Sequence, residues 1–337
     1  MGTISVVTGG NGFVGAKLAE ALLRRGDSVR VLDIGEKSRV EGVDYRRVDI
    51  REPEAVLSAI EGAEVIFHTA SAVHTKQSLR DEIFAINLGG TRHLLDAAEK
   101  LGVPRFVYVS SASVVYEGRD IESGDESLPY SSLSQAPYAD SKIEAERLVL
   151  ERNSQACLTI AIRPHLIFGP GDSRFLPSIL AKADSGILRF AIGDGSSLSD
   201  YTYIDNLIDA LLLADEKLKG EAIAAGKAYF ITNGEPMAFW EFVSRVLERL
   251  GYPQILFRIP FPVAYGLAAL KEWFEVLRGR EASADDGFTR FAIKYMCTHH
   301  YFSIERAKEE LGYTPRVSLD EGIERTCAAI ESARSEK

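Results

Sequence analysis

The stretch Ile4-Ser-Val-Val-Thr-Gly-Gly-Asn-Gly-Phe-Val-Gly15 decides how this chain folds. A short β-branched run, Ile4–Thr8, leads into a glycine-rich turn, and a helical pattern over Val14–Arg25 follows. The turn has the spacing G-x-G-x-x-G at Gly10, Gly12 and Gly15, and Gly9 precedes it. Such glycines allow a tight turn and a close approach of pyrophosphate, and the helix N-terminus offers free N–H groups. The strand–turn–helix context therefore predicts a dinucleotide-binding unit.

Short apolar runs and helical patterns alternate through the first half of the chain. Further strands are expected at Ser28–Asp33, Tyr45–Val48, Val65–His68, Phe106–Ser110 and Leu158–Arg163. Further helices are expected at Pro53–Ile60, Ile83–Leu101 and Tyr138–Arg152. This alternation predicts an α/β fold, a Rossmann-type doubly wound parallel sheet.

The pattern loosens after about residue 170, where βαβ alternation gives way to mostly helical patterns. Helices are expected at Asp205–Leu218, Phe239–Leu250, Ser303–Leu311 and Ser318–Glu331, with a strand at Ala228–Thr232. We expect residues 1–170 to form the dinucleotide-binding domain and residues 171–337 a smaller substrate-binding lobe that interleaves with the sheet.

Composition excludes several classes of protein. The chain has 337 residues, of which 46% are hydrophobic and 26% charged, so it is a folded globular protein rather than a disordered one. A formal net charge of −10 argues against a nucleic-acid surface. Three cysteines cannot build a disulfide framework, and no secretory signal is evident. A cytoplasmic protein is expected, and no metal site is proposed.

Asp33, at the end of the second strand, selects between cofactors. An acidic residue about 20 positions after the turn accepts hydrogen bonds from a ribose and repels a 2′-phosphate, so NAD is favoured over NADP. Lys37 and Arg39 lie nearby and soften this preference. Asp49 and Ile50 follow the third strand, where an adenine contact is expected, although a strand-end cap explains Asp49 nearly as well.

Tyr138 and Lys142 stand four residues apart at the start of a predicted helix and therefore share one face. A phenol titrates near pH 10 in water, and a neighbouring ammonium lowers that pKa. Tyr138 can then accept the proton of an alcohol. Tyr-x-x-x-Lys is common by chance, and only its place after a dinucleotide turn favours this interpretation.

Serines follow the strand Phe106–Ser110, and a hydroxyl at the carboxyl end of such a strand points into the ligand crevice. One of them is expected to hold the substrate oxygen beside Tyr138. A nucleophilic serine is disfavoured because Gly-x-Ser-x-Gly is absent from this region.

Together these motifs resemble the extended short-chain dehydrogenases/reductases. The resemblance covers nearly the whole chain and adds Phe67-His-Thr-Ala70, Asn87-Leu-Gly-Gly-Thr91 and Arg163-Pro-His165. It implies that Tyr138 is the base, Lys142 its activator and Ser111 the serine that orients the substrate, with Ser110 and Ser113 as alternatives. It also implies a set of cofactor-binding residues: Gly9, Gly12, Phe13, Val14, Gly15, Asp33, Asp49, Ile50, Thr69, Ala70, Ser71, Asn87, Tyr138, Lys142, Pro164 and His165.

Two positions argue against a nucleotide-sugar epimerase, which usually carries Asn and Arg where this chain has His165 and Ser199. Where the chain departs from the epimerase pattern, it resembles the 3β-hydroxysteroid dehydrogenase branch of the family, and most of all the decarboxylating sterol-4-carboxylate 3-dehydrogenases. The matching stretches include Ile162–Pro170 and Tyr301–Lys308. This resemblance implies NAD-dependent oxidation of a 3β-hydroxysteroid, a 4-carboxysterol that then loses carbon dioxide. A reductase or dehydrogenase of another bulky β-hydroxy or β-keto substrate, a nucleotide-sugar epimerase, and a dinucleotide-sensing regulator are the alternatives.

The segment Pro260–Leu270 is apolar but too short to span a bilayer. It is expected to be either a buried helix or an entrance for a lipid substrate that touches a membrane surface. The family resemblance further implies a homodimer, formed through the helices Ile83–Leu101 and Tyr138–Arg152.

Overall fold

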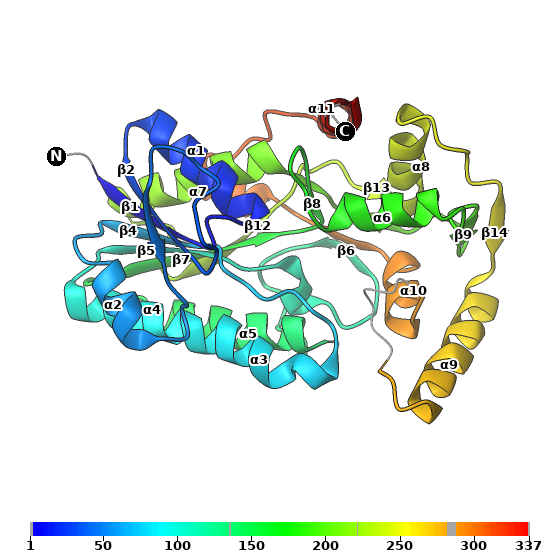
Figure 1. The fold of residues 1–337 in the computed structure, drawn as a ribbon, viewed down its shortest axis with the longest axis horizontal. Coiled ribbons are helices and arrows are strands. Elements are labelled where there is room, and N and C mark those ends of the chain that lie inside the picture. Colours follow the sequence, from blue (N-terminus) through cyan, green and yellow to red (C-terminus); the bar gives the residue numbers. More distant parts are fainter. Residues whose placement is uncertain (1–2, 135, 221, 282–287, 336–337) are drawn as a thin grey trace.

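The computed structural model describes residues 3–134, 136–220, 222–281 and 288–335. Its centre is a sheet of seven parallel strands in the order β12-β7-β5-β4-β1-β2-β3, which confirms the predicted doubly wound fold (Figure 1). The strands are β1 (Ile4–Thr8), β2 (Ser28–Asp33), β3 (Asp44–Arg47), β4 (Val65–His68), β5 (Arg105–Val109), β7 (Leu158–Pro164) and β12 (Lys227–Ile231).

Helices cover both faces of this sheet because its inner strands are apolar on both sides. Val7 and Phe67 pack into one core, and Val6 and Ile66 pack into a second core on the opposite face. In Figure 1, α1 (Phe13–Arg25) and α7 (Ile204–Lys219) lie above the sheet. Below it lie α2 (Pro53–Ala59), α3 (Arg80–Phe84), α4 (Gly90–Leu101) and α5 (Pro137–Glu151).

The helix expected over Ile83–Leu101 is wrong as a single regular helix. A π-helical turn, η2 (Ala85–Gly89), separates α3 from α4. Such turns often occur at functional sites. Here the turn carries Asn87, a predicted site residue, which is buried.

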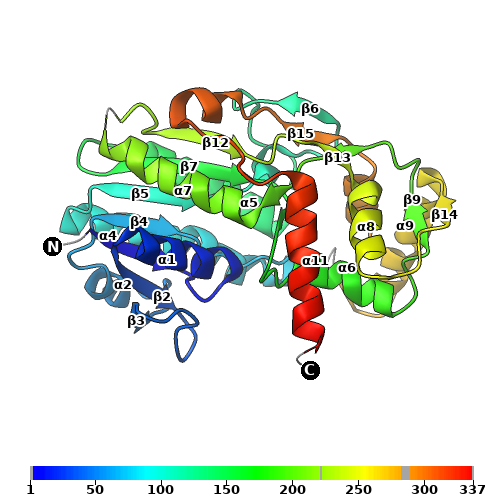
Figure 2. The same ribbon diagram turned by 90° about the horizontal axis from the view of Figure 1, so that it is seen from above.

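Short strands and helices build the smaller lobe (Figure 2). A four-stranded sheet consists of β13 (Met237–Ala238), β10 (Leu198–Ser199), β15 (His300–Phe302) and β6 (Ile121–Gly124), in that order. Two further sheets have two strands each: β11 (Thr202–Tyr203) with β8 (Ile167–Phe168), and β14 (Phe257–Ile259) with β9 (Phe190–Ile192). The helices are α6 (Phe175–Asp184), α8 (Phe239–Arg249), α9 (Phe261–Leu277), α10 (Arg290–Met296) and α11 (Leu319–Ser335), and the short turns are η1 (Gln77–Leu79), η3 (Ala112–Val115) and η5 (Ala307–Leu311). The proposed domain division at residue 170 stays a prediction.

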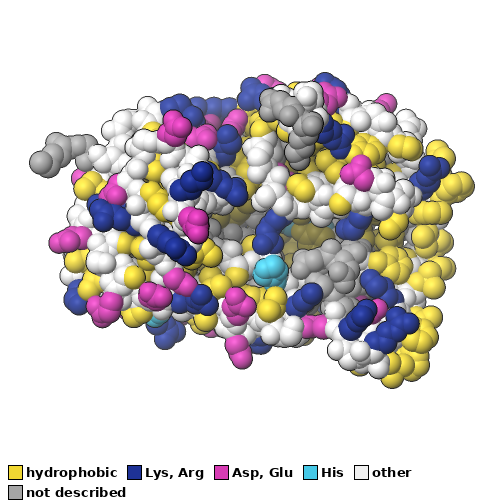
Figure 3. Space-filling view, in the orientation of Figure 1, with side chains coloured by type: hydrophobic (Ala, Val, Ile, Leu, Met, Phe, Trp, Pro, Cys, Tyr) yellow, Lys and Arg dark blue, Asp and Glu magenta, His cyan; other side chains and the backbone are white. Residues whose placement is uncertain are grey.

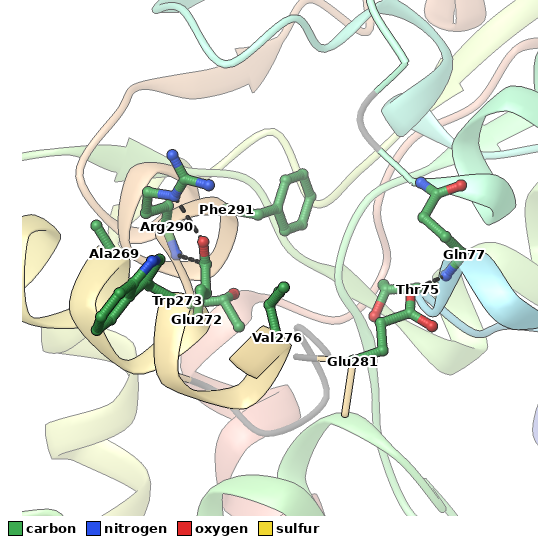
Figure 4. A pocket seen from close by; sticks show the side chains of 10 residues that line it. Thr75, Gln77, Ala269, Glu272, Trp273, Val276, Glu281, Arg290 and Phe291 are labelled. Atoms are coloured by element: carbon green, nitrogen blue, oxygen red, sulfur yellow. Dashed lines mark hydrogen bonds and ion pairs between the residues drawn. The ribbon is translucent and has the colours of Figure 1, made fainter. Parts of the chain in front are cut away.

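The carboxyl ends of β1, β4 and β5 meet at one edge of the large sheet, the edge where ligands bind in such folds. A pocket of about 690 Å³ lies between α9, α10 and the segment that follows β4. Figure 4 shows Ala269, Trp273 and Val276 on one side of this pocket, and Thr75 and Gln77 on the other.

Candidate active site

The glycine-rich turn forms a cradle at the end of β1. Gly9 has a φ of 66°, a conformation that favours glycine, and a Cβ there would lie 2.7 Å from the Cα of Ala70. A Cβ on Gly15 would lie 2.3 Å from the carbonyl oxygen of Gly9. Helix α1 begins at Phe13, followed by Val14, and no side chain among the described residues caps its N-terminus at Gly12. The cradle therefore fits the pyrophosphate of a dinucleotide.

Asp33 is joined directly to this turn. Its Oδ2 accepts the backbone N–H of Asn11 at 3.0 Å, and its Oδ1 accepts that of Gly35 at 3.1 Å. A carboxylate accepts about four hydrogen bonds, so capacity remains for two ribose hydroxyls. The structure thus places Asp33 beside the glycine-rich turn, and its contact with a ribose stays a prediction.

Asp49 and Ile50 lie farther along the same edge, after β3. Asp49 forms an ion pair with Arg51, with 2.5 Å between Oδ2 and Nη2, and its Oδ1 accepts the backbone N–H of Arg51 at 2.9 Å. Ile50 is buried, and its carbonyl oxygen lies 3.0 Å from Nδ1 of His93. Asp49 already has a cationic partner in Arg51, so this local ion pair explains the position of its carboxylate as well as a contact with adenine would.

The segment after β4 lies beside the turn. The hydroxyl of Thr69 donates to the carbonyl oxygen of Thr8 at 2.6 Å, and Ala70 follows it against Gly9. The hydroxyl of Ser71 donates to Oδ1 of Asn87 at 3.2 Å. These bonds fix the segment next to the cradle.

Asn87 connects this segment to α5. Its Nδ2 donates to the carbonyl oxygen of Ala72 at 3.0 Å and to Oγ of Ser141 at 2.8 Å. Its Oδ1 also accepts the backbone N–H of Ala72 at 2.7 Å. One buried amide therefore holds the cofactor side of the site at a fixed position relative to the helix that carries Tyr138.

Tyr138, on the first turn of α5, meets Ser111, which caps η3 directly after β5. Burial raises the pKa of Tyr138, while a hydrogen bond with Ser111 and the positive charge of Arg174 lower it. Oγ of Ser111 accepts hydrogen bonds from the backbone N–H and the hydroxyl of Ser113. The hydroxyl of Ser110 is buried and has no hydrogen-bond partner among the described residues. Of the three serines, Ser111 is thus the one in contact with Tyr138.

Lys142 lies one turn along α5 and is buried. Its Nζ donates to the carbonyl oxygen of Val109 at 2.6 Å and to the hydroxyl of Tyr108 at 3.2 Å. Burial lowers the pKa of Lys142 to about 7, and the charge of Glu146 acts in the opposite direction. The Lys142 ammonium is thus held against β5, one helical turn from Tyr138.

Pro164 ends β7, and His165 follows it with its side chain turned into the smaller lobe. Nε2 of His165 lies 2.8 Å from Nδ1 of His300 and 3.3 Å from the hydroxyl of Tyr295. The structure therefore places the His165 ring against these two residues, which lie more than a hundred positions later in the chain.

Arg174 is a site residue that the sequence analysis missed. It precedes α6, and its Nη1 donates to the carbonyl oxygen of Val73, in the segment after β4, at 2.5 Å. Among the described residues no carboxylate forms an ion pair with it, although its charge acts on Tyr138. No motif spacing marks such an arginine, because its position depends on a contact between two distant loops.

Comparison with known proteins agrees with this geometry. Residues 6–262 match the model of the 3-beta hydroxysteroid dehydrogenase/isomerase family. The chain belongs to this family. A mouse relative, "sterol-4-alpha-carboxylate 3-dehydrogenase, decarboxylating", is 37% identical over 98% of this chain and 92% of the relative. A 2-alkyl-3-oxoalkanoate reductase of Stenotrophomonas maltophilia is 39% identical over 96% of this chain and 98% of the relative.

Solved structures share the fold of this 3-beta hydroxysteroid dehydrogenase/isomerase family member. An epimerase from Methanothermobacter thermautotrophicus has a TM-score of 0.78 at 24% identity and covers 99% of this chain and 94% of its own. A Thermus thermophilus UDP-glucose 4-epimerase in complex with NAD has a TM-score of 0.72 at 24% identity, over 98% of this chain and 100% of its own. At this identity the likeness concerns the fold alone. The family match confirms the dehydrogenase resemblance seen in the sequence.

Proposed function

We propose that this protein is an NAD-dependent dehydrogenase that oxidises the 3β-hydroxyl of a 4-carboxysterol, after which the product loses carbon dioxide. The observation that carries the reaction type is the contact between Tyr138 and Ser111 beside the buried Lys142. The substrate class is supported by the decarboxylating sterol dehydrogenase relatives, 36% identical in the human case and 37% in the mouse case.

The side chains divide the work as follows. Ser111 donates a hydrogen bond to the substrate oxygen, and Tyr138 takes the hydroxyl proton as general base. Lys142, when charged, stabilises the phenolate that this requires. NAD⁺, when bound in the glycine cradle, supplies the hydride acceptor. The resulting ketone carries a carboxylate on the adjacent carbon, and such a β-keto acid releases carbon dioxide without a further dedicated base.

Arg174 supports a substrate that carries a carboxylate. A guanidinium close to the base, with no carboxylate partner among the described residues, offers a charge-assisted site for an acid group beside the reacting oxygen. A plain 3β-hydroxysterol has no group that would use this charge.

A second substrate class shares this chemistry. The Stenotrophomonas relative is named for a 2-alkyl-3-oxoalkanoate, an acid in which one carbon atom separates the ketone from the carboxylate. Reduction of such a β-keto acid by this chain would use Tyr138 as proton donor and Arg174 for the same acid group. The alternative is therefore an open-chain β-keto acid rather than a nucleotide sugar.

The test is NADH formation from NAD⁺ with a 4-carboxysterol, a plain 3β-hydroxysterol and a UDP-hexose in parallel, and NADH consumption with a 2-alkyl-3-oxoalkanoate. Oxidation of the carboxysterol, with a decarboxylated ketone found by mass spectrometry, is the expected result. Turnover of only the oxoalkanoate would replace the sterol with the open-chain acid, and turnover of only the sugar would contradict both.

We also propose that α9 contacts a membrane surface. This helix buries the small residues Ala264 and Ala268 and exposes its large ones, the reverse of a helix packed on a core, so the expectation of a buried helix is wrong. Exposed large apolar residues continue onto β9 and β14, along the right edge of Figure 3. They are Phe190, Leu256, Phe257, Phe261, Val263, Leu267, Leu270, Trp273, Phe274, Val276 and Leu277.

A continuous apolar surface of this kind marks an interaction site. The pocket beneath α9 is lined by Trp273 and Val276 of the same helix, which would let an apolar substrate pass from a bilayer into the site (Figure 4). Within the described part of the chain, no helix has the length and apolar character needed to cross a bilayer.

Vesicle flotation tests this membrane contact. The unaltered protein should float with phosphatidylcholine vesicles, and L267S/L270S should lose most of this binding. I223S, which alters an exposed apolar residue outside this surface, is the matched control. Light scattering of the unaltered protein and of L267S/L270S tests the expected homodimer. If L267S/L270S loses the dimer but still floats with the vesicles, the apolar surface belongs to a contact with a second copy of the chain.

A further inference from the structure

A cluster of two buried histidines and one half-buried tyrosine lies between the large sheet and the smaller lobe. His165 follows β7, His300 begins β15 and Tyr295 belongs to α10. The rings of Tyr295 and His300 stack with centroids 4.2 Å apart, and those of His165 and His300 meet edge-on at 4.9 Å. The reaction described above uses none of these three side chains.

Hydrogen bonds fix the protons of both histidines. Nε2 of His300 lies 2.8 Å from the backbone carbonyl oxygen of Tyr295, which can only accept, so this nitrogen carries a proton. Burial lowers the pKa of His300 to about 4, so the ring is neutral and its Nδ1 is bare. Two groups face that Nδ1: the hydroxyl of Ser199 at 2.9 Å and Nε2 of His165 at 2.8 Å. Two bare ring nitrogens would repel each other at 2.8 Å, so Nε2 of His165 carries a proton and shares the Nδ1 lone pair with the Ser199 hydroxyl.

This proton arrangement decides which hydrogen bonds the hydroxyl of Tyr295 can make. It lies 3.3 Å from the same Nε2 of His165, which is already a donor, so the phenol oxygen can only accept there. No other acceptor for the phenol proton is found among the described residues. A half-buried hydroxyl whose proton has no acceptor among the described residues is ready to donate it to a ligand.

Tyr295 interacts both with a residue that lines the pocket and with the base. Phe291, which lines the pocket beneath α9, stacks on Tyr295 with centroids 6.1 Å apart. On the other side, the phenol of Tyr138 is near enough to act on the pKa of Tyr295, which burial raises first of all. A substrate that reaches Tyr138 from this pocket would therefore pass Tyr295.

We propose that Tyr295 is a second hydrogen-bond donor to the substrate oxygen on the reacting carbon, and that His300 and His165 are positioning residues that turn its proton toward that oxygen. This rests on the proposed function, in which Tyr138 removes the proton of the same oxygen. Negative charge grows on the oxygen as the proton leaves, and a preorganised neutral donor stabilises it. Tyr295 and Ser111 would then hold the oxygen from two sides.

Nitrogen-15 NMR of histidine-labelled protein tests the proton arrangement without any turnover. We expect both His165 and His300 as neutral Nε2–H tautomers from about pH 6 to pH 8. A bare Nε2 on His165 would accept the Tyr295 proton and overturn the proposal, whatever the substrate.

Kinetics test the role of the hydroxyl. Y295F should lower kcat about 100- to 1,000-fold, the range expected for loss of one preorganised donor to a developing oxyanion, with NAD affinity and Tm near the wild-type values. Y252F is the matched control, since the Tyr252 hydroxyl donates to Asp184 at 2.6 Å on the surface of the same lobe. A kcat of Y295F within twofold of the wild type would overturn the proposal.

A double-variant cycle separates positioning from structure. H165L should lower kcat in the wild-type protein and have no further effect in Y295F, because its action passes through the Tyr295 proton. Equal losses in both backgrounds would mean that His165 merely supports the fold. If the wild type oxidises none of the offered alcohols, the proposed function fails, while the NMR result still decides the proton arrangement.

Discussion

Replacing Arg174 with glutamine tests how the site recognises an acid group. Nη1 of Arg174 donates to the carbonyl oxygen of Val73, and its remaining N–H groups have no carboxylate partner among the described residues. A charge-assisted hydrogen bond contributes about 1.5–3 kcal/mol. Because Arg174 is exposed and its charge is screened, we take the lower end, which corresponds to about a tenfold change.

We therefore expect R174Q to lower kcat/KM for a 4-carboxysterol about tenfold more than for a plain 3β-hydroxysterol. The arginine also lowers the pKa of Tyr138, so in R174Q the limb of the pH–rate profile on which the rate rises with pH should move to higher pH with both substrates. Initial rates of NADH formation, with NAD affinity measured by calorimetry, give both quantities. R249Q, at an arginine paired with Glu324 on the surface, is the control.

Two results would refute this reasoning. Equal losses with the acid and the plain sterol would show that Arg174 does not read the carboxylate. A large loss of NAD affinity would assign the guanidinium to the pyrophosphate. The loop before Arg174 lies next to the start of α1, since a Cβ on Gly171 would be 3.7 Å from the ring of Phe13.

Three shorter predictions follow from the same structure. Y138F should fold and bind NAD but lose at least about a hundredfold in kcat, and near-normal turnover measured by NADH absorbance would remove Tyr138 as the base. G15A should abolish NAD binding in calorimetry, since its Cβ would lie 2.3 Å from the carbonyl oxygen of Gly9, and unchanged affinity would place the cofactor elsewhere. Burial raises the pKa of Asp200 to about 7, above its ordinary value of 3.8, so the folded protein loses stability as pH rises between these values. D200N should therefore raise the free energy of unfolding by about 4 kcal/mol at pH 8 and change it little at pH 4, as read from denaturant titrations at both pH values.

The sheet was predictable because its information is local. β1, β2 and β4 have the predicted bounds, since strands buried on both faces are continuous apolar runs that polar turns interrupt. The π-helical turn at Asn87 was not predictable in this way. It depends on the bonds from Asn87 to Ala72 and Ser141, which come from two other elements.

The smaller lobe was the least predictable part. β10 and β13 have two residues each, too few for a period-two pattern to appear in the sequence. They form only because β15, about a hundred residues later than β10, provides the strand between them and β6. Helix α9 has an apolar composition in the sequence, but only its packing shows that the large side chains face outward.

The same contrast divides the candidate site itself. The predicted cofactor half consists of a turn and an i, i+4 pair, whose geometry follows from spacing alone, so Gly9, Gly15, Tyr138 and Lys142 could be singled out in the sequence. The substrate half brings residues from separate elements to one base, and its positions depend on packing between the sheet and the lobe. A chain can therefore keep the cofactor half unchanged while the lobe is rebuilt around another substrate. This explains why epimerases share this fold at 24% identity or less, while the human sterol-4-alpha-carboxylate dehydrogenase and the Stenotrophomonas 2-alkyl-3-oxoalkanoate reductase, at 36% and 39% identity, are named for other substrates.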